Sequence, residues 1–156
     1  MFADITSSKE HQRKLDYIAH YDALTALPNR LLLADRLQQA LAQARRRSIG
    51  IAVAFIDLDG FKAVNDTHGH GVGDGLLTAV AKRMKETLRQ GDTLARVGGD
   101  EFVAILADLQ DCATAVPVLD RLLAAASEVV VIDDISLSVS ASIGVVFSHQ
   151  HQAHEA

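Results

Sequence analysis

Residues 96–102 read Arg-Val-Gly-Gly-Asp-Glu-Phe, and this stretch decides how the whole chain is interpreted. Apolar runs precede and follow it, so Thr93–Val97 and Phe102–Leu106 are predicted to be two strands joined as a hairpin. The two glycines permit the positive φ angles that a tight hairpin turn demands. The turn would then present Asp100 and Glu101 at a fixed, exposed tip, although acidic glycine turns are also common without any function.

The composition indicates a single acidic domain. The chain has 156 residues, of which 49% are apolar, enough to build one core. Its net charge of −5 argues against nucleic acid as a main partner, because duplex binding needs a basic face. Cys112 is the only cysteine, so no intrachain disulfide can form. No apolar run approaches the roughly 20 residues of a membrane span and no signal-peptide pattern is present, so we expect a soluble, cytoplasmic domain without direct membrane contact.

The order of predicted elements favours an α+β fold. Residues 4–20 are interpreted as an exposed helix, either a stalk that pairs with a copy of itself or a frayed end. Besides the hairpin, apolar periodicity predicts helices over 31–47, 72–89 and 111–128, a short helix or turn over 60–67, strands over 49–57, 129–132 and 135–147, and a polar tail over 148–156. This mixture fits a sheet covered by helices rather than a doubly wound parallel sheet.

A second acidic cluster closes the predicted strand over 49–57. Asp57 would lie at the end of a buried strand, where a charge is costly unless it is paired or binds a cation. Near Asp100, it would form a two-carboxylate oxygen site of the kind that Mg²⁺ favours, with water and substrate phosphates completing the octahedron. Backbone N–H groups of the following segment, 60–62, can cradle phosphate oxygens. The alternative for Asp57 and Asp59 is capping of the next helix.

Asn65, His70 and Asp74 form a third group, placed in a loop that leads into the helix over 72–89. A carboxylate can accept two hydrogen bonds from a purine amide and amino edge, and an asparagine amide can both donate and accept. Those chemistries suit guanine better than adenine. Asp74 can instead be the N-cap of the helix.

Four motifs in register make the chain resemble a GGDEF domain of the diguanylate cyclase family. They are Asp22–Arg30, the group formed by 57–66, 69–70 and 73–74, the signature turn Arg96–Phe102, and Ser142–Gly144. The resemblance covers residues 22–147. It implies a nucleotide-cyclase or ferredoxin-like palm, in which a mainly antiparallel sheet is flanked by helices. Residues 1–20 would then be a linker helix, and residues 21–156 the GGDEF domain.

The resemblance implies an enzyme that condenses two GTP molecules into cyclic di-GMP and pyrophosphate, with one GTP on each subunit of an antiparallel homodimer. Mg²⁺ (or Mn²⁺) would be held by the carboxylates of Asp57 and Asp100 and by the backbone carbonyl of Leu58. Asp100 or Glu101 would help to deprotonate the attacking 3′-hydroxyl, and the family favours Asp100. Substrate contacts would come from Phe61 and Lys62 at the phosphates, and from Asn65, His70 and Asp74 around the base.

Arg89 and Asp92 match an Arg-x-x-Asp inhibitory pattern of the same family, which implies a second site for the cyclic di-GMP product. Arg89 would grip guanine or phosphate, and Asp92 would accept from a guanine edge. Outside this register such a pair is usually a surface ion pair of little worth.

The resemblance also sets expectations for the two ends of the chain. The family's C-terminal helix, with its basic phosphate contact, has no counterpart, so we expect exposed apolar sheet surface. Residues 2–9 resemble the end of a PAS sensor domain, which places a sensor upstream in a parent protein. Two other functions stay open. One is a non-catalytic GGDEF domain that binds GTP or cyclic di-GMP, and the other is a cyclase that acts on ATP.

Overall fold

The computed structural model describes residues 2–149, and most of the predicted polar tail, 150–156, lies outside them. The helices are α1 (Phe2–His20), α2 (Arg30–Arg47), α3 (Phe61–His68), α4 (His70–Glu86) and α5 (Cys112–Ser127). The strands are β1 (Gly50–Asp59), β2 (Thr93–Arg96), β3 (Glu101–Leu109), β4 (Val130–Ile132), β5 (Ile135–Leu137) and β6 (Ser140–His149).

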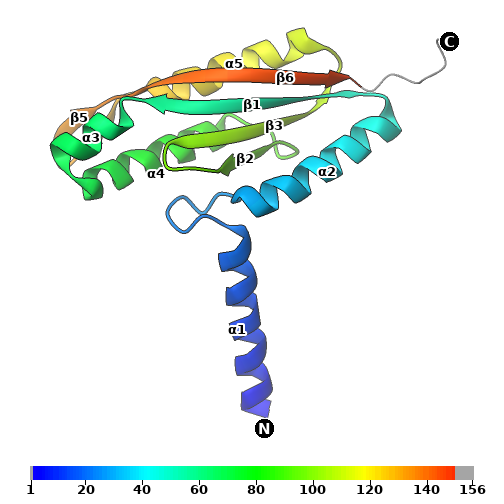
Figure 1. The fold of residues 1–156 in the computed structure, drawn as a ribbon, viewed down its shortest axis with the longest axis horizontal. Coiled ribbons are helices and arrows are strands. Elements are labelled where there is room, and N and C mark those ends of the chain that lie inside the picture. Colours follow the sequence, from blue (N-terminus) through cyan, green and yellow to red (C-terminus); the bar gives the residue numbers. More distant parts are fainter. Residues whose placement is uncertain (1, 150–156) are drawn as a thin grey trace.

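Four strands form one sheet in the order β2-β3-β1-β6, and every neighbouring pair is antiparallel. The strands β4 and β5 pair separately as a short hairpin. Figure 1 shows α4 and α5 on one face of the sheet and α2 on the other. The predicted α+β fold with a mainly antiparallel sheet is therefore confirmed.

The core lies between the sheet and the helices α4 and α5. Alternate residues of β1 point into it and are at most 2% exposed, namely Ala52, Ala54, Ile56 and Leu58. Residues of the opposite parity, such as Ile51 and Ile105, are buried on the face that α2 covers. The strand β1 is thus buried on both faces only over its first residues, because Phe55, Asp57 and Asp59 on the α2 side of the sheet are exposed.

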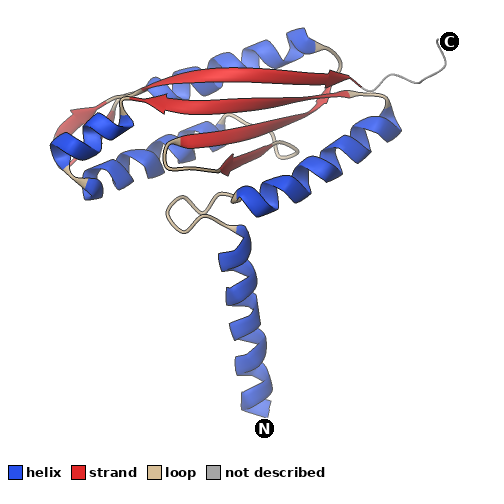
Figure 2. Cartoon of the chain, in the orientation of Figure 1, coloured by secondary structure: helices blue, strands red, loops and turns tan. Residues whose placement is uncertain are grey.

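Part of the sheet is not covered. Figure 2 shows β6 along the edge of the sheet, beside β1. Phe55, Val145 and Val146 on these two strands are 52%, 43% and 60% exposed, so the expected exposed apolar surface is present. The helix α1 extends away from the sheet in Figure 1, and Leu15 and Ile18 on it are 48% and 71% exposed.

Several predicted boundaries were wrong. No loop leads into the helix after Asn65, because α3 and α4 are separated by Gly69 alone, whose φ of 90° lets the chain reverse at one residue. The helix α4 also ends at Glu86 rather than residue 89. The run over 135–147 is two strands, because β5 pairs with β4 while β6 joins the main sheet. The strand β1 continues to Asp59, which pairs with Ser140.

The prediction for the two signature glycines was also wrong. Neither Gly98 nor Gly99 has a positive φ, whereas Gly60 and Gly69 do. The turn is closed by backbone hydrogen bonds to Glu101 O from the N–H groups of Val97 at 3.0 Å and Gly98 at 3.3 Å. A Cβ on Gly98 would lie 3.1 Å from Glu101 Oε2, a tight contact that a small shift of the flexible Glu101 side chain can relieve.

Candidate functional site

The signature turn lies against the end of β1. The register pairs Asp57 of β1 with Glu101 of β3, and the N–H of Leu58 donates to Asp100 O at 3.0 Å. Carboxylate oxygens of Asp57, Asp100 and Glu101 consequently lie within 4.8 Å of one another. The sequence predicted that Asp57 and Asp100 would meet, and the structure brings Glu101 into the same cluster as a third acid.

The chemistry of this acidic cluster fits a hard divalent cation. Three like charges at such short range repel one another, and a bound cation removes that repulsion. The donor set consists of carboxylate oxygens, which suit Mg²⁺ or Mn²⁺ better than softer metals. Asp57 and Glu101 are exposed and Asp100 is half-buried, so water or phosphate oxygens can reach a cation held there.

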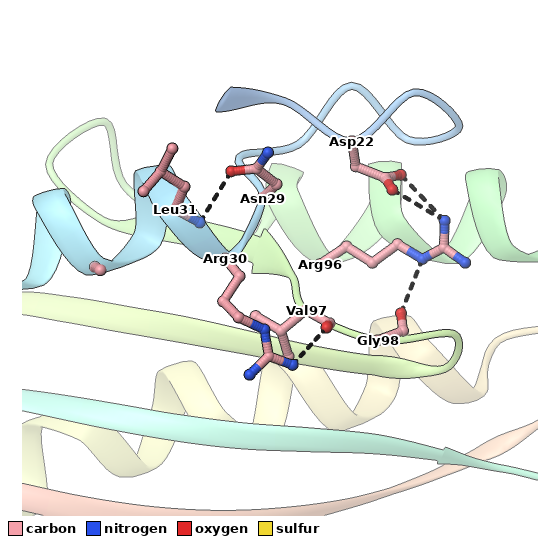
Figure 3. A pocket seen from close by; sticks show the side chains of 8 residues that line it. Asp22, Asn29, Arg30, Leu31, Arg96, Val97 and Gly98 are labelled. Atoms are coloured by element: carbon pink, nitrogen blue, oxygen red, sulfur yellow. Dashed lines mark hydrogen bonds and ion pairs between the residues drawn. The ribbon is translucent and has the colours of Figure 1, made fainter. Parts of the chain in front are cut away.

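Arg96 holds the signature turn in shape. Figure 3 shows its guanidinium donating to Gly98 O at 3.1 Å and to both carboxylate oxygens of Asp22 at 3.1 and 3.2 Å. It also donates to Gly99 O at 2.9 Å. The side chains of Arg96 and Asp22 are only 18% and 20% exposed. Asp100 directly follows Gly99. Its position is therefore fixed by the contacts of Arg96, which join the turn to Asp22 in the N-terminal part of the chain.

A second arginine supports the same turn from α2. Arg30 donates to Val97 O at 2.8 Å, and with Arg96 it lines an open hollow of about 770 Å³ beside the turn (Figure 3). Asn29 is the N-cap of α2, and its side-chain amide also donates to Ala19 O at the end of α1 at 2.8 Å. The sequence motifs contained Arg30 and Arg96, but no role was predicted for either. Their partners are far away in sequence, and only the folded chain reveals them.

The ionisation of Asp22 reflects these contacts. Partial burial raises the pKa of its carboxyl group, but hydrogen bonds from Thr25 and the charge and hydrogen bonds of Arg96 outweigh burial and hold the pKa below its ordinary value. The backbone N–H and the hydroxyl of Thr25 both donate to Asp22 Oδ2 at 2.8 Å. Asp22 is therefore ionised and paired at neutral pH.

The segment expected at the phosphates is the beginning of α3. Gly60 is its N-cap, with a φ of 91° and no side-chain capping bond, so the alternative that Asp57 or Asp59 caps this helix is wrong. Asp59 instead accepts from Ser142 Oγ at 2.8 Å. The first N–H groups of a helix lack intrahelical acceptors and face outward. Phe61 is 8% exposed and belongs to the core, whereas Lys62 is exposed.

The residues expected around the base lie on α3 and α4. Asn65 packs against Gly73 of α4, and its Oδ1 is buried without a hydrogen-bond partner. His70 and Asp74 are exposed and one turn apart on α4. Because α4 begins at His70 with Gly69 as its N-cap, the alternative that Asp74 caps the helix is wrong. The Oδ1 atom of Asn65 therefore lies between α3 and α4, against the backbone of Gly73.

Arg89 and Asp92 lie between α4 and β2 and form an ion pair that is exposed on the arginine side and buried on the aspartate side. The side chain of Asp92 is 1% exposed, and its two oxygens accept from the N–H groups of Arg89 and Ala107, each at 3.0 Å. The guanidinium of Arg89 is 3.5 Å from Asp92 Oδ2, donates to Ala107 O, and has a side chain that is 54% exposed. Asp92 fastens this segment to β3, while Arg89 presents a partly free cation at the surface.

Comparison with protein-family profiles matches residues 19–156 to the family described as diguanylate cyclase, GGDEF domain. The chain is 47% identical over 140 residues to the bifunctional diguanylate cyclase/cyclic di-GMP phosphodiesterase MucR of Pseudomonas aeruginosa. The aligned residues make up 90% of this chain and 20% of MucR. The chain spans only about a fifth to a third of the length of the first curated relatives that it matches, namely 20% and 33%.

Solved structures give the same match. The GGDEF domain of TpbB (YfiN) from Pseudomonas aeruginosa superposes with a TM-score of 0.78 and 40% identity, covering 82% of this chain and 75% of that one. The coiled coil and GGDEF domain of DgcB from Caulobacter crescentus, determined in complex with c-di-GMP, superposes with a TM-score of 0.83 and 26% identity, covering 96% and 80%. Within residues 2–149, no helix combines the length and apolar character needed to cross a membrane.

Proposed function

The chain belongs to the GGDEF family of diguanylate cyclase domains, and on that premise we propose that it condenses two GTP molecules into cyclic di-GMP and two pyrophosphates. The observation that carries the proposal is the cluster formed by Asp57, Asp100 and Glu101, whose carboxylate oxygens lie within 4.8 Å of one another at the tip of the signature turn. Family membership supplies the reaction class, and the acidic cluster supplies the groups that such a reaction needs.

The acidic cluster is proposed to hold Mg²⁺ or Mn²⁺ with the triphosphate of GTP. A metal ion held there would neutralise charge that develops on the phosphates during transfer. Asp57 and Asp100 are the proposed ligands together with the carbonyl of Leu58, and Glu101 is close enough to join them. Lys62 and the N–H groups at the beginning of α3 would orient the phosphates, with the side chain of Phe61 anchoring that turn in the core.

The reaction is an in-line phosphoryl transfer that occurs twice. The 3′-oxygen of one GTP attacks the α-phosphorus of the other, the bond between the α-phosphorus and the bridging oxygen breaks, and pyrophosphate leaves. Asp100 or Glu101 accepts the proton of the 3′-hydroxyl. One bound GTP offers only one half of each reacting pair, so two subunits must face each other as a homodimer to bring the reactants together.

Recognition of guanine is proposed for Asn65 and Asp74, with His70 close by on α4. The amide of Asn65 and the exposed carboxylate of Asp74 suit guanine, which has N–H donors at N1 and at the 2-amino group, two positions where adenine has none. Product inhibition is proposed at Arg89, whose half-exposed guanidinium can pair with a phosphate or a guanine of cyclic di-GMP. Asp92 would support that site through the backbone, since its own oxygens already accept two N–H groups.

The proposal also includes a sensor domain in the parent protein and the pairing of α1 with its copy. We place an upstream sensor domain before α1, with residues 1–20 as the connecting helix. The exposure of Leu15 and Ile18 supports a helix that pairs with its copy in the homodimer.

Nucleotide selectivity tests the proposed substrate. With Mg²⁺ present, GTP at about 100 times its dissociation constant should stabilise the chain by about 2.7 kcal/mol, which raises the melting temperature by roughly 5–10 °C. ATP should give a much smaller shift. Equal shifts with the two nucleotides would contradict the guanine assignment and favour a cyclase that acts on ATP.

Pyrophosphate release tests the dimer and separates the enzyme from the alternative. The rate per subunit should rise with protein concentration until the homodimer is fully formed, because one subunit cannot react alone. A rate per subunit that does not depend on concentration would contradict the dimer. Binding of GTP or cyclic di-GMP without any pyrophosphate release would favour the alternative, a non-catalytic binding module.

A further inference from the structure

Ser142 holds a carboxylate that the proposed reaction does not use. Its hydroxyl donates to Asp59 Oδ2 at 2.8 Å, from the first residues of β6 to the end of β1. In the antiparallel register the partner of Ser142 is Asp57, so this hydrogen bond runs diagonally between side chains on one face of the sheet. Ser140 is the residue directly opposite Asp59. The acidic cluster at the signature turn does not include Asp59, which is therefore a separate negative charge.

Asp59 directly precedes Gly60, the N-cap of α3. The side chain of an aspartate often accepts from the backbone N–H two residues on, which here belongs to Phe61 in the first turn of α3. In the structure, Asp59 accepts from Ser142 instead. Apart from the chain neighbours of Gly60, no described residue lies within 4 Å of a Cβ placed on it. A carboxylate released from Ser142 therefore has room to turn toward the first N–H groups of α3.

A carboxylate at the beginning of α3 would weaken binding of the triphosphate. It would accept from the N–H groups that the proposed function assigns to phosphate oxygens, and its negative charge would repel the phosphates. It would also give Lys62 a competing partner. The hydroxyl of Ser142 supplies a donor on the sheet, which favours the orientation of Asp59 that leaves the beginning of α3 open.

We propose that Ser142 is a positioning residue for the triphosphate of the substrate. Its hydroxyl holds the carboxylate of Asp59 against β6 and thereby leaves the first N–H groups of α3 free to donate to phosphate oxygens. Ser142 touches no reacting atom and acts only through Asp59. This inference rests on the proposed function, because it takes the beginning of α3 as the place where the phosphates bind.

The test compares Ser142→Ala with the matched control Ser140→Ala in the full chain. Binding of an α,β-methylene analogue of GTP, which cannot release pyrophosphate, is measured calorimetrically with Mg²⁺. Ser142 and Asp59 are both exposed, so their hydrogen bond is a modest one, and we expect Ser142→Ala to weaken binding about three- to tenfold. Ser140→Ala and Ser142→Thr, which keeps the hydroxyl, should change it less than about twofold. Wild-type affinity in Ser142→Ala, or equal losses in Ser142→Ala and Ser140→Ala, would overturn the inference.

The double variant shows whether Ser142 acts through Asp59. Asp59→Ala removes the competing carboxylate, so it should bind the GTP analogue at least as tightly as the wild-type chain. Adding Ser142→Ala to Asp59→Ala should then have no further effect. A double variant that binds as weakly as Ser142→Ala would overturn the inference, because the loss would not depend on the carboxylate.

Inorganic tripolyphosphate and Lys62→Ala separate this inference from the proposed function. With Mg²⁺, Ser142→Ala should weaken tripolyphosphate by the same factor as the GTP analogue, since guanine has no part in the effect. Weak binding in Lys62→Ala, together with wild-type affinity in Ser142→Ala, would overturn the inference and leave the proposed function standing. Wild-type affinity in Lys62→Ala would overturn the assignment of the phosphates to α3, and the inference with it.

Folding of the variants is checked by thermal melting. Because the hydrogen bond between Ser142 and Asp59 is exposed, Ser142→Ala should melt within about 3 °C of the wild-type chain. A larger fall that accounts for the lost affinity, and that Asp59→Ala does not reverse, would overturn the inference in favour of a purely structural role.

Discussion

Replacing Arg96 with alanine should destabilise the chain far more than its position beside a surface turn suggests. The variant removes the partner of Asp22 and the donors to Gly98 O and Gly99 O at once. Asp22 would keep its charge in a site where its side chain is only 20% exposed. The carbonyls of the signature turn would lose the contacts that shape it next to Asp100.

The size of the effect follows from burial. Exposed ion pairs contribute about 0–1 kcal/mol, and removing one partner of a fully buried pair costs about 3–5 kcal/mol. The Arg96 and Asp22 side chains are 18% and 20% exposed, so this pair lies between those limits. We expect Arg96→Ala to lower the free energy of unfolding by about 2–3 kcal/mol. For a domain of this size, the melting temperature should fall by roughly 5–10 °C.

Urea denaturation followed by circular dichroism measures this loss, and Arg47→Ala is the matched control. The pair between Arg47 and Asp108 is shorter, at 2.8 Å, but its side chains are 57% and 48% exposed, so its loss should cost less than about 1 kcal/mol. Equal losses in the two variants, or a loss below about 0.5 kcal/mol for Arg96→Ala, would refute the claim that burial makes this contact strong.

Three further predictions address charge at other positions. Because the pKa of Asp22 is lowered in the folded chain, its contribution to stability is present above its ordinary pKa of 3.8 and lost as the pH falls through the folded-state value. In Asp22→Asn, the free energy of unfolding should therefore depend less on pH in that acid range. An unchanged pH dependence, measured by urea denaturation, would count against the pairing of Asp22. Asp57→Asn should weaken Mn²⁺ binding at least tenfold in an electron paramagnetic resonance titration. It should not lower the melting temperature of the metal-free chain, since it removes one of three charges within 4.8 Å; unchanged affinity would place the metal elsewhere. Asp92→Ala should lower the free energy of unfolding by about 2–4 kcal/mol, because it leaves two N–H groups without acceptors. Arg89→Ala should cost less than half as much because its side chain is half exposed, and equal costs in urea denaturation would contradict the buried role of Asp92.

Much of the fold could be predicted because the apolar patterns are strong. The run that became β1 is continuously apolar from Ile51 to Ile56, and the hairpin around the signature turn shows two apolar runs separated by glycines. The helix predicted over 111–128 is α5, and the structure shows Asp111 as its N-cap, with a side chain that accepts from Thr114 N. These features depend on neighbours in the sequence, so the sequence shows them directly.

The errors have different physical causes, of which only the division of the run over 135–147 depends on contacts distant in sequence. Gly98 and Gly99 were expected to supply positive φ, but the turn is shaped by hydrogen bonds that Arg96 donates to its carbonyls and that Glu101 O accepts from Val97 and Gly98. The run over 135–147 divides because its two halves pair with different strands, and no local signal shows which partner each half finds. The loop expected around the residues that follow Asn65 is compressed into Gly69 alone.

The candidate site could be predicted in part. The pairing of Asp57 with Asp100 was anticipated from a strand end and a turn tip, and the antiparallel register adds Glu101 to them. The support of the turn by Arg30 and Arg96 was missed, because the residues involved are separated by 67 and 74 positions from their partners. Only the folded structure brings these residues together, on the side of the sheet that α2 covers.

The measurement that tests the central claim most directly is product analysis by chromatography after incubation with GTP and Mg²⁺. We expect cyclic di-GMP from the wild-type chain, an equal amount from Asp35→Ala, whose carboxylate is exposed on α2, and none from Asp100→Ala, whose acid belongs to the cluster at the signature turn. Cyclic di-GMP from Asp100→Ala at the wild-type rate, or none from a wild-type chain that binds GTP, would contradict the claim that this acidic cluster carries out the reaction.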